Sequence, residues 1–435
     1  MVELACSQYG SHVVLKLIKY GTREVHKAIL DEITGNCRRL AVHRNGCSIL
    51  DIAYRCASNA EQRNAMLLEF YGKEFTLFRN SSEVAPSLNE LIEKEPEKKS
   101  SILENIKNSL LRMVNKGTVT MVICHRLLLD YLKNVSIEAA REMVDLFREH
   151  VVDVMQTAEG TQSVIILLSI GLPKDRKAIA KALKPHVIDM CKDPDGHLVI
   201  ASALDVIDDT VLTGKCIVAD ICSRFRTLSE DACASKVILQ VLAPRCPRYF
   251  SADEIALLAP HEHSTSKKDP ELRRKELLKR IIPTALKEIA GDHQLLRERI
   301  GGSVVVETLK CAVSGEYDGT DAALQNLADQ LVEDWNEYGA ESVFADVIGH
   351  RNIKRIVAEV ESDLFAQGLM SLLKDSDKCE GVLASRACWI VCAMIEHGSD
   401  AITELVVPTL HKPLKALRDQ KSAGLKTLRQ LLKKQ

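Results

Sequence analysis

The residues of this sequence with the clearest chemical potential are basic side chains that could hold a polyanion. His12, Lys16 and Lys19 fall at i, i+4 and i+7, so a helix would place all three on one face. A second basic group follows, made of Arg38, Arg39, His43 and Arg44. Positive charge within reach of phosphates is enough to bind them, and such binding weakens with salt. The alternative is that these residues are solvated surface charges, as most lysines and arginines are.

Two other basic segments are weaker candidates. The stretch LPKDRKAIAKALKPH places four lysines on one helical stripe, with Arg176 beside it: Lys174, Lys177, Lys181 and Lys184. We expect this helix on a convex outer surface, where solvation alone explains the charge. The stretch SKKDPELRRKELLKR supplies Lys267, Lys268, Arg273 and Arg274. Its interspersed carboxylates make local ion pairs an equal explanation.

Charge is distributed unevenly along a chain whose total charge is only −2. Residues 1–50 contain seven Lys or Arg against four Asp or Glu, and residues 301–350 contain one against ten. Residues 406–435 contain eight against one, and this basic, amphipathic tail could touch RNA, contact a partner or cap the fold. Because local sign decides where a polyanion can sit, the acidic segment is expected to keep polyanions away.

No catalytic or metal-binding pattern accompanies these charges. The sequence contains no phosphate-binding glycine loop, HExxH or GxSxG motif. The fourteen cysteines include no CxxC pair, and Cys388 and Cys392 alone do not supply a zinc site. His261 and His263 flank Glu262 in a polar stretch that is more typical of a loop than of a metal site. We therefore expect a protein that is not an enzyme, needs no cofactor or metal, and does not span a membrane.

A repeat positions the basic residues along the chain. The stretch QYGSHVVLKLIKYG around Gly10 is followed 36 residues later by HRNGCSILDIAYRC around Gly46, and related stretches recur. The residues that mark the later units are Ala85, Cys124, Gly160, Gly196, Ala234, Gly301, Gly349 and Ala387. The 67 residues from Ala234 to Gly301 interrupt the series. They contain HEHSTSKKDP, which we expect to be a loop, and Pro270, which we expect in the first turn of a helix.

Each unit predicts two helices. A small residue precedes an apolar helix of about twelve residues, and a polar turn leads to an amphipathic helix such as TREVHKAILDEITG. The expected core stripe of the first unit is Val13, Val14, Leu17 and Ile18, and Thr22 is expected to cap the second helix. One helix pair cannot bury its apolar face alone, whereas stacked pairs can. The sequence therefore predicts an all-α solenoid.

The pattern QYGSHVVLKLIKYG, with its period near 36, resembles the Pumilio (Puf) repeat. The longer stretches AEQRNAMLLEFYGKEFTLF, GLPKDRKAIAKALK, ALDVIDDTVL and SKKDPELRRKELL are similar to the Puf-A branch of that family. The resemblance implies a right-handed α-solenoid of Puf (armadillo-like) repeats, curved or L-shaped. We expect N-terminal Puf repeats over residues 1–105, the first one incomplete, and central Puf-like repeats over residues 106–260. Residues 261–435 are expected to be divergent Puf-like repeats that follow the polar loop.

The same resemblance implies a function. Members of this branch bind structured or double-stranded RNA, and DNA, without strong sequence preference. They act in the nucleus, mainly in the nucleolus, in pre-rRNA processing and assembly of the large ribosomal subunit. For this chain the resemblance implies a monomer with pre-rRNA or other structured RNA, DNA and ribosome-assembly proteins as partners. The open alternatives are a helical-repeat scaffold that binds proteins and a translational repressor of specific mRNAs.

Base readout in Puf repeats uses three positions of one helix, here called positions 1, 2 and 5. In this sequence those positions hold Ser11, His12 and Leu15; Cys47, Ser48 and Asp51; His125, Arg126 and Leu129; Thr161, Gln162 and Ile165; His197, Leu198 and Ala201; and Ser235, Lys236 and Leu239. A divergent unit adds Cys388, Trp389 and Cys392. Position 5 is apolar in five of the first six units, and an apolar side chain cannot hydrogen-bond a base. We therefore predict phosphate binding without sequence-specific readout, with Arg126 and Lys236 added to the basic residues of the first two units.

Overall fold

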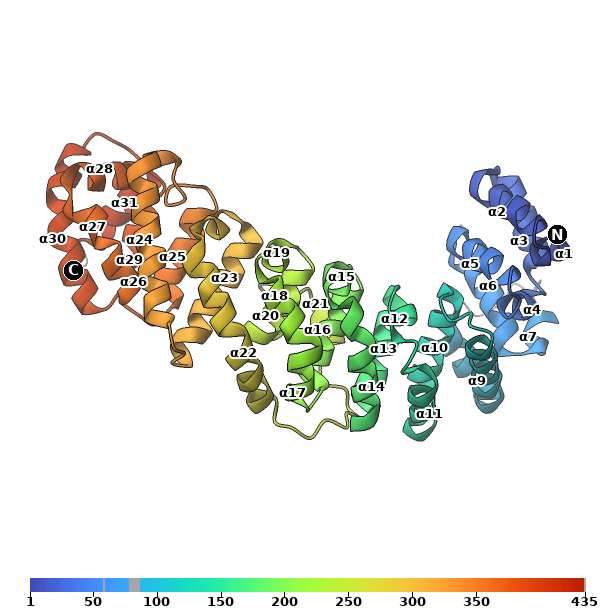
Figure 1. Cartoon of the computed structure of the whole chain (residues 1–435). Helices are drawn as coiled ribbons and strands as arrows, with labels where there is room; N and C mark the ends of the chain where they lie inside the picture. The colour runs from blue at the N-terminus through green and yellow to red at the C-terminus, as the bar shows by residue number, and fades with distance from the viewer. Residues whose placement is uncertain (58, 78–86, 434–435) are drawn as a thin grey trace. The chain divides into compact units, whose positions relative to one another are not determined.

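The computed structural model describes residues 1–57, 59–77 and 87–433, and within these residues it contains helices, turns and loops but no strand (Figure 1). The predicted all-helical repeat fold is confirmed. Eight of the ten repeat markers lie within an α-helix, and Ala387 lies directly before one. The eight include Gly301, which lies in the helix that begins at Arg299. The marker Ala85 lies outside the described residues.

The helices follow one another along the chain with short connections. Up to His186 they are α1 (Val2–Cys6), α2 (Gly10–Tyr20), α3 (Arg23–Ile33), α4 (Cys37–Ala41), α5 (Gly46–Cys56), α6 (Ala60–Tyr71), α7 (Lys73–Leu77), α8 (Leu88–Lys94), η1 (Pro96–Lys98), α9 (Lys99–Asn115), α10 (Val122–Asn134), α11 (Ile137–Phe147), α12 (Val151–Val154), α13 (Ala158–Ile170), α14 (Pro173–Leu183) and η2 (Lys184–His186). Up to Gly291 they are α15 (Val187–Lys192), α16 (Gly196–Val206), α17 (Thr210–Thr213), the π-helical η3 (Gly214–Val218), α18 (Ala219–Ser223), α19 (Phe225–Glu230), α20 (Ala234–Leu242), α21 (Ala252–Leu257) and α22 (Pro270–Gly291). The remainder are η4 (His293–Arg297), α23 (Arg299–Ser314), α24 (Thr320–Tyr338), η5 (Gly339–Glu341), α25 (Gly349–Glu359), α26 (Leu364–Gly368), α27 (Met370–Lys374), α28 (Ser376–Ala384), α29 (Cys388–His397), α30 (Asp400–Ala416) and α31 (Ala423–Leu431).

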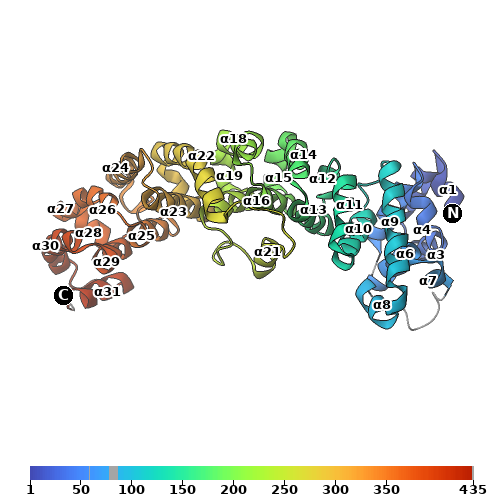
Figure 2. The same cartoon turned by 90° about the horizontal axis from the view of Figure 1, so that it is seen from below.

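The chain divides into two compact units. Unit 1 comprises Met1–His186, Val206–Asp208 and Ala256–Lys267, and unit 2 comprises Val187–Asp205, Asp209–Ile255 and Lys268–Gln435. Repeat markers occur in both units, at Gly10 and Gly160 in unit 1 and at Gly301 and Gly349 in unit 2. Figures 1 and 2 label the helices of both units. The three-part division at residues 105 and 260 that the sequence suggested stays a prediction.

One helix of each repeat packs against its counterpart in the next repeat. In unit 1, α2 packs on α5, α5 on α10 and α10 on α13. In unit 2, α20 packs on α23, α23 on α25, α25 on α29 and α29 on α31. We call these helices, together with α16, the inner row. They carry the positions that read bases in Puf repeats, so the inner row is the part of the fold that matters for function.

The small residue at the start of an inner-row helix is required by a close backbone approach. A Cβ on Gly160 would lie 1.7 Å from the carbonyl oxygen of Val154, and one on Gly349 would lie 2.2 Å from that of Val343. The amide N–H of the same glycine donates to a side chain three residues earlier, as from Gly160 to Thr157 Oγ1 at 3.1 Å. The repeat signal of the sequence is therefore a tight turn between a short helix and the inner-row helix.

The structure corrects two details of the predicted repeat. Each of several units contains a third, short helix before the inner-row helix, namely α4, α12, α15 and α19. These helices of four to six residues are too short to show a hydrophobic period in the sequence. The core stripe predicted for the first unit is also only half buried, because Val14 and Ile18 are buried while Val13 and Leu17 are 56% and 38% exposed. The cap predicted from Thr22 is confirmed, since its side chain accepts from the amide of Val25.

The interruption after Ala234 is a helix, a polar loop and a long helix. The loop that follows α21 belongs to unit 1, where the Thr265 amide donates to the Ser169 carbonyl at 2.9 Å. The helix α22 begins at Pro270 as predicted, with Asp269 as its N-cap. Across the described part of the chain, no helix has both the length and the apolar character needed to cross a bilayer.

Candidate nucleic-acid interface

The basic face predicted on the first inner-row helix exists. His12, Lys16 and Lys19 are all exposed on α2. The ammonium groups of Lys16 and Lys19 lie 5.2 and 5.5 Å from the centre of the Tyr20 ring. Neither lysine is ion-paired with a carboxylate of the described residues. These cations are therefore available to an external anion.

In the second basic group, the three arginines have no carboxylate partner among the described residues, whereas His43 caps a helix. Arg39 and Arg44 are exposed and Arg38 is half-buried, and none of the three is ion-paired within the described ranges. His43 has a structural role, because its Nδ1 accepts from the amides of Asn45 and Gly46 at 3.2 Å each. The ring thereby caps the start of α5. Three arginines of this group remain candidates for phosphate contacts, and His43 can offer only its other nitrogen.

Arg126 and Lys236 lie on the inner row but are already paired. Arg126 is half-buried on α10 and donates to Asp130 at 3.0 Å, and the Tyr71 hydroxyl donates to the same carboxylate at 3.1 Å. Burial raises the pKa of Asp130, and the hydrogen bonds from Arg126 and Tyr71 offset this only in part. Lys236 contacts Glu254 at 2.5 Å. An incoming phosphate would have to compete with these carboxylates.

The lysine stripe of α14 is exposed, as expected for an outer helix. Lys174, Lys177, Lys181 and Lys184 all reach solvent, whereas the neighbouring Arg176 is buried. The Arg176 guanidinium donates to the carbonyl oxygens of Leu168 and Ser169 at the end of α13, at 2.8 and 2.9 Å. It also donates to Thr265 of the polar loop at 2.9 Å. Arg176 therefore holds the fold together and offers nothing to a ligand.

Two arginines of the third basic segment also donate hydrogen bonds to carbonyl oxygens near helix ends, as Arg176 does. Arg273 is buried and donates to the carbonyl oxygen of Asp205, near the end of α16. Arg274 donates to the carbonyl oxygens of Val241 and Leu242 at the end of α20. Lys268 is paired with Glu276, whereas the Lys267 side chain is exposed. Helix C-termini leave carbonyl groups without partners, and these guanidinium groups satisfy them.

The base-reading positions are mostly inside the protein. Position 1 was expected to face the ligand, but Ser11, His125, Thr161, His197 and Ser235 are all buried. Position 5 is buried in four units, at Leu129, Ile165, Ala201 and Leu239. In most units, therefore, positions 1, 2 and 5 do not share one exposed surface. Position 2 reaches solvent at His12, Ser48 and Gln162, whereas Leu198 at the same position is buried.

A further basic position lies near the end of three inner-row helices of unit 1, and only its first member, Lys19, was singled out from the sequence. Counted from the small marker residue, Lys19, Arg55 and Lys133 all stand nine residues on, in α2, α5 and α10. All three are exposed, although Arg55 is paired with Asp51 at 2.8 Å and Lys133 donates to Gln162. The signal was present in the repeat spacing. These residues extend the basic surface of α2 along the inner row of unit 1.

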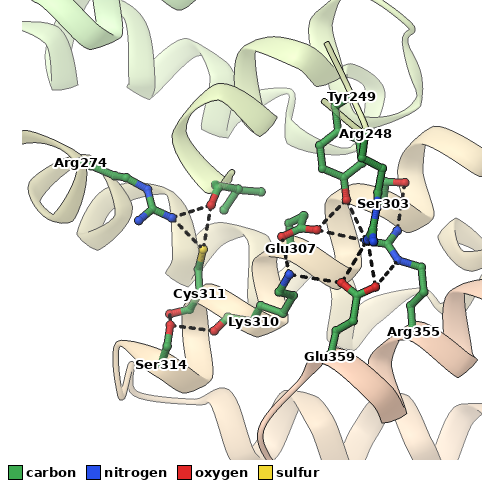
Figure 3. Close-up of polar contacts among 11 residues, drawn as sticks. Arg248, Tyr249, Arg274, Ser303, Glu307, Lys310, Cys311, Ser314, Arg355 and Glu359 are labelled. Atoms are coloured by element: carbon green, nitrogen blue, oxygen red, sulfur yellow. Dashed lines mark hydrogen bonds and ion pairs between the residues drawn. The ribbon is translucent and has the colours of Figure 1, made fainter. Parts of the chain in front are cut away.

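In unit 2 the residue at the corresponding position of α23, Lys310, belongs to a network in which basic and acidic side chains neutralise one another (Figure 3). Arg355 of α25 donates to Glu359, Glu307 and the Tyr249 hydroxyl at 2.8 to 3.4 Å. Arg248 and Lys310 also contact Glu359, at 2.9 and 3.2 Å. Burial alone would raise the pKa of Glu359, but hydrogen bonds from Arg355 and Arg248 outweigh it and lower the pKa to about 2. This part of the inner row therefore offers little unpaired positive charge.

No cluster that could hold a metal ion stands beside these surfaces. Among the residues that the structure describes, no group of three or more His, Cys, Asp or Glu side chains converges in that way. The two loop histidines His261 and His263 face each other at a tilted angle, with 5.9 Å between ring centres. The features that can act on a ligand are thus charge and aromatic surface.

Similarity to known proteins agrees with this geometry. Residues 1–34 and 36–69 match the Pumilio-family RNA binding repeat, and residues 230–365 match the CPL (NUC119) domain. The chain is 29% identical over 444 residues to Pumilio homology domain family member 6 of Schizosaccharomyces pombe, covering 99% of this chain and 68% of that protein. It spans 55% of the length of human Pumilio homolog 3, which is also 29% identical.

Solved structures extend the match to the whole fold. The crystal structure of human Puf-A superposes with a TM-score of 0.89 at 26% identity, covering 99% of this chain and 85% of that one. The crystal structure of human Puf-A in complex with DNA gives a TM-score of 0.88 at 26% identity, covering 98% and 84%. The Pumilio repeats and the CPL domain thus occur here in the same helical framework.

Proposed function

From the premise that the chain belongs to the Pumilio-like Puf-A family, we propose that it binds structured RNA, and DNA, through backbone phosphates and without sequence-specific base readout. The observation that supports this most directly is the surface of unit 1. Lys16, Lys19, Arg39 and Arg44 are exposed there without a carboxylate partner among the described residues. Phosphates are positioned by such contacts, which carry no sequence information of their own.

The absence of readout follows from the burial of the reading positions. A bidentate contact to a base edge discriminates by about 1–3 kcal/mol, and a run of such contacts makes a Puf repeat array specific. Here the buried residues at positions 1 and 5, such as Thr161 and Ile165, cannot reach a base edge without opening the helix packing. Translational repression of specific mRNAs, which requires readout, is therefore disfavoured.

We propose that this binding serves pre-rRNA processing and assembly of the large ribosomal subunit in the nucleolus, with pre-rRNA and ribosome-assembly proteins as partners of a monomeric chain. The support is the family membership. The activity proposed is binding, without catalysis. In-cell crosslinking followed by sequencing of the bound RNA tests the ligand, and imaging of the tagged protein tests the location. Recovery of dispersed mRNA sites, with no enrichment of pre-rRNA, would contradict this role.

Binding itself is tested by charge reversal with a matched control. The variant K16E/K19E/R39E changes three exposed cations of unit 1, and K177E/K181E/K184E makes the same change in net charge on α14. Each lost phosphate contact reduces the salt slope of binding by about 0.9 for duplex nucleic acid. We expect the first variant to lose affinity for a structured RNA and about 2 to 3 units of slope, and the second to change little. Equal losses in both variants would show that net charge, and not this surface, is responsible.

The scaffold alternative loses its structural basis. It relied on apolar residues at position 5 forming a groove, but Leu129, Ala201 and Leu239 are buried. A parent protein that fails to bind any RNA at roughly 50 mM salt would revive that alternative.

A further inference from the structure

The end of the inner row in unit 2 carries unpaired positive charge, part of it from the basic tail over residues 406–435. Helices α25, α29 and α31 pack in succession, and seven cations lie on them or beside them: Arg351, Lys354, Arg386, Lys421, Lys426, Arg429 and Lys433. None of the seven is ion-paired with a carboxylate of the described residues. This contrasts with the network around Glu359 on the same helix α25, where Arg248, Lys310 and Arg355 all pair with that carboxylate.

Trp389 lies beside one of these cations, Lys354. It is half-buried in the first turn of α29, and the Lys354 ammonium group lies 5.7 Å from the centre of its ring. On the other side is α31, where a Cβ on Gly424 would lie 3.7 Å from the indole Nε1. The other tryptophan, Trp335, is buried against Phe344 at 5.9 Å between ring centres. Trp389 is thus the tryptophan that can meet a ligand.

Four of these cations line a hollow along α31, the helix whose Gly424 lies against Trp389. It has a volume of about 520 Å³ and is lined by Lys421, Ser422, Ala423, Lys426, Arg429, Gln430 and Lys433. Arg429 is held in place because its guanidinium donates to the Leu417 carbonyl oxygen at 2.8 Å. A volume of this size falls in the range of about 300–1,000 Å³ that is usual for small-ligand sites. All its charged lining residues are positive, so an anion of nucleotide size is the complementary occupant.

We propose that this surface binds single-stranded nucleic acid, with an unpaired base stacked on Trp389 and the flanking phosphates held by the lysines of α25 and α31. An aromatic ring among cations is the combination that binds single strands, because every base has a face to stack and every nucleotide a phosphate. The inference rests on the proposed function and adds a base-contacting site to it. Unit 1 binds the backbone alone, whereas this site distinguishes unpaired from paired nucleotides.

Tryptophan fluorescence of the full chain provides the readout. The substitution Trp335→Phe leaves Trp389 as the only tryptophan, since the chain contains two. We expect oligo(dT) of about 12 nucleotides to quench this emission, with the same midpoint as its anisotropy titration. A hairpin duplex is expected to bind without quenching. If oligo(dT) binds by anisotropy but leaves the emission unchanged, the site is overturned while the proposed function stands. If neither nucleic acid binds, the proposed function fails.

Variants separate stacking from charge. In the background of K16E/K19E/R39E, Trp389→Ala is expected to weaken oligo(dT) binding about fivefold or more, and Trp389→Phe to retain most of it. Neither Trp389 variant should change the affinity for the hairpin duplex. An equal loss of affinity for oligo(dT) and for the duplex would show that a base does not stack on Trp389. Because Trp389→Ala removes packing, K426E/K433E supplies a second test on exposed residues of the hollow. That variant should also weaken oligo(dT) binding, and unchanged affinity would overturn the proposal.

Discussion

Replacing His125 should remove a set of hydrogen bonds that stabilises unit 1 at neutral pH and is lost in acid. This buried ring lies in a relay of hydrogen bonds, with Nδ1 2.9 Å from the Thr157 hydroxyl and Nε2 2.8 Å from the Val119 carbonyl oxygen. Nε2 must carry the proton, because a carbonyl only accepts. Nδ1 then accepts from the Thr157 hydroxyl, whose oxygen accepts from the Gly160 amide. The relay joins α10 to the cap of α13, and it requires a neutral ring.

The pKa of His125 gives the size of the stability that its neutral ring contributes. Burial lowers the pKa of His125 from 6.5 to about 4. The unfolded chain therefore binds this proton at a higher pH than the folded chain does. The stability that the neutral ring supports is fully present above pH 6.5 and is lost as the pH falls toward 4. A difference of 2.5 units at 1.36 kcal/mol each amounts to about 3 kcal/mol.

Hydrogen exchange of the amides in α10 and α13 measures this locally. We expect the parent to lose protection there between pH 6.5 and 4.5, after correction for intrinsic rates. His125→Gln should lower protection at pH 7.5 but flatten its pH dependence, whereas His411→Gln, at an exposed position, should behave as the parent. If the parent and His125→Gln show the same pH slope in these helices, the relay is not what makes the packing acid-sensitive.

Three further substitutions test the framework by urea unfolding. Gly160→Ala should destabilise the fold by about 2 kcal/mol or more, because the new Cβ would lie 1.7 Å from the Val154 carbonyl oxygen. Gly196→Ala is the control and should cost less, because its nearest contact is the flexible Met190 Sδ at 3.1 Å. Equal costs for the two substitutions would contradict the close-approach argument. Arg176→Ala should cost about 2–4 kcal/mol because two carbonyl groups lose their donor, whereas the exposed Lys177→Ala should cost almost nothing. Glu359→Gln should cost roughly 2 kcal/mol at pH 7, against no change for the exposed Glu361→Gln. Because the pKa of Glu359 is lowered from 4.5 to about 2, its contribution is full above pH 4.5 and lost as the pH falls toward 2, so a parent–variant difference that persists at pH 2 would argue against the ion pairs.

The repeat could be predicted from the sequence because its causes are local. Gly10, Gly160 and Gly349 mark a turn in which an added Cβ would meet a backbone carbonyl oxygen, and this requirement recurs along the chain. The cap at Thr22 depends on three consecutive residues and was equally visible. The pair Arg126 and Asp130 stands at i, i+4, so its neutralisation could also have been inferred from spacing.

The remaining features depend on contacts distant in sequence. Nothing in the stretches around Arg176 and Arg274 shows that their guanidinium groups reach the ends of α13 and α20. The burial of position 1 depends on how neighbouring repeats stack, as with His125 against Val119 and Thr157. The cationic end of unit 2 combines Lys354 with a helix some 70 residues further along the chain. Composition shows the charge there but not its convergence on Trp389.

The central claim is phosphate binding without base readout, and one titration series tests it most directly. The affinity of the full chain is measured by anisotropy for one structured RNA and for scrambled sequences of the same fold, at roughly 50 and 200 mM salt. The account predicts affinities that agree within a few fold across sequences and fall steeply, by more than about tenfold, between the two salt concentrations. A preference of about a hundredfold for one sequence, or binding that is insensitive to salt, would contradict it.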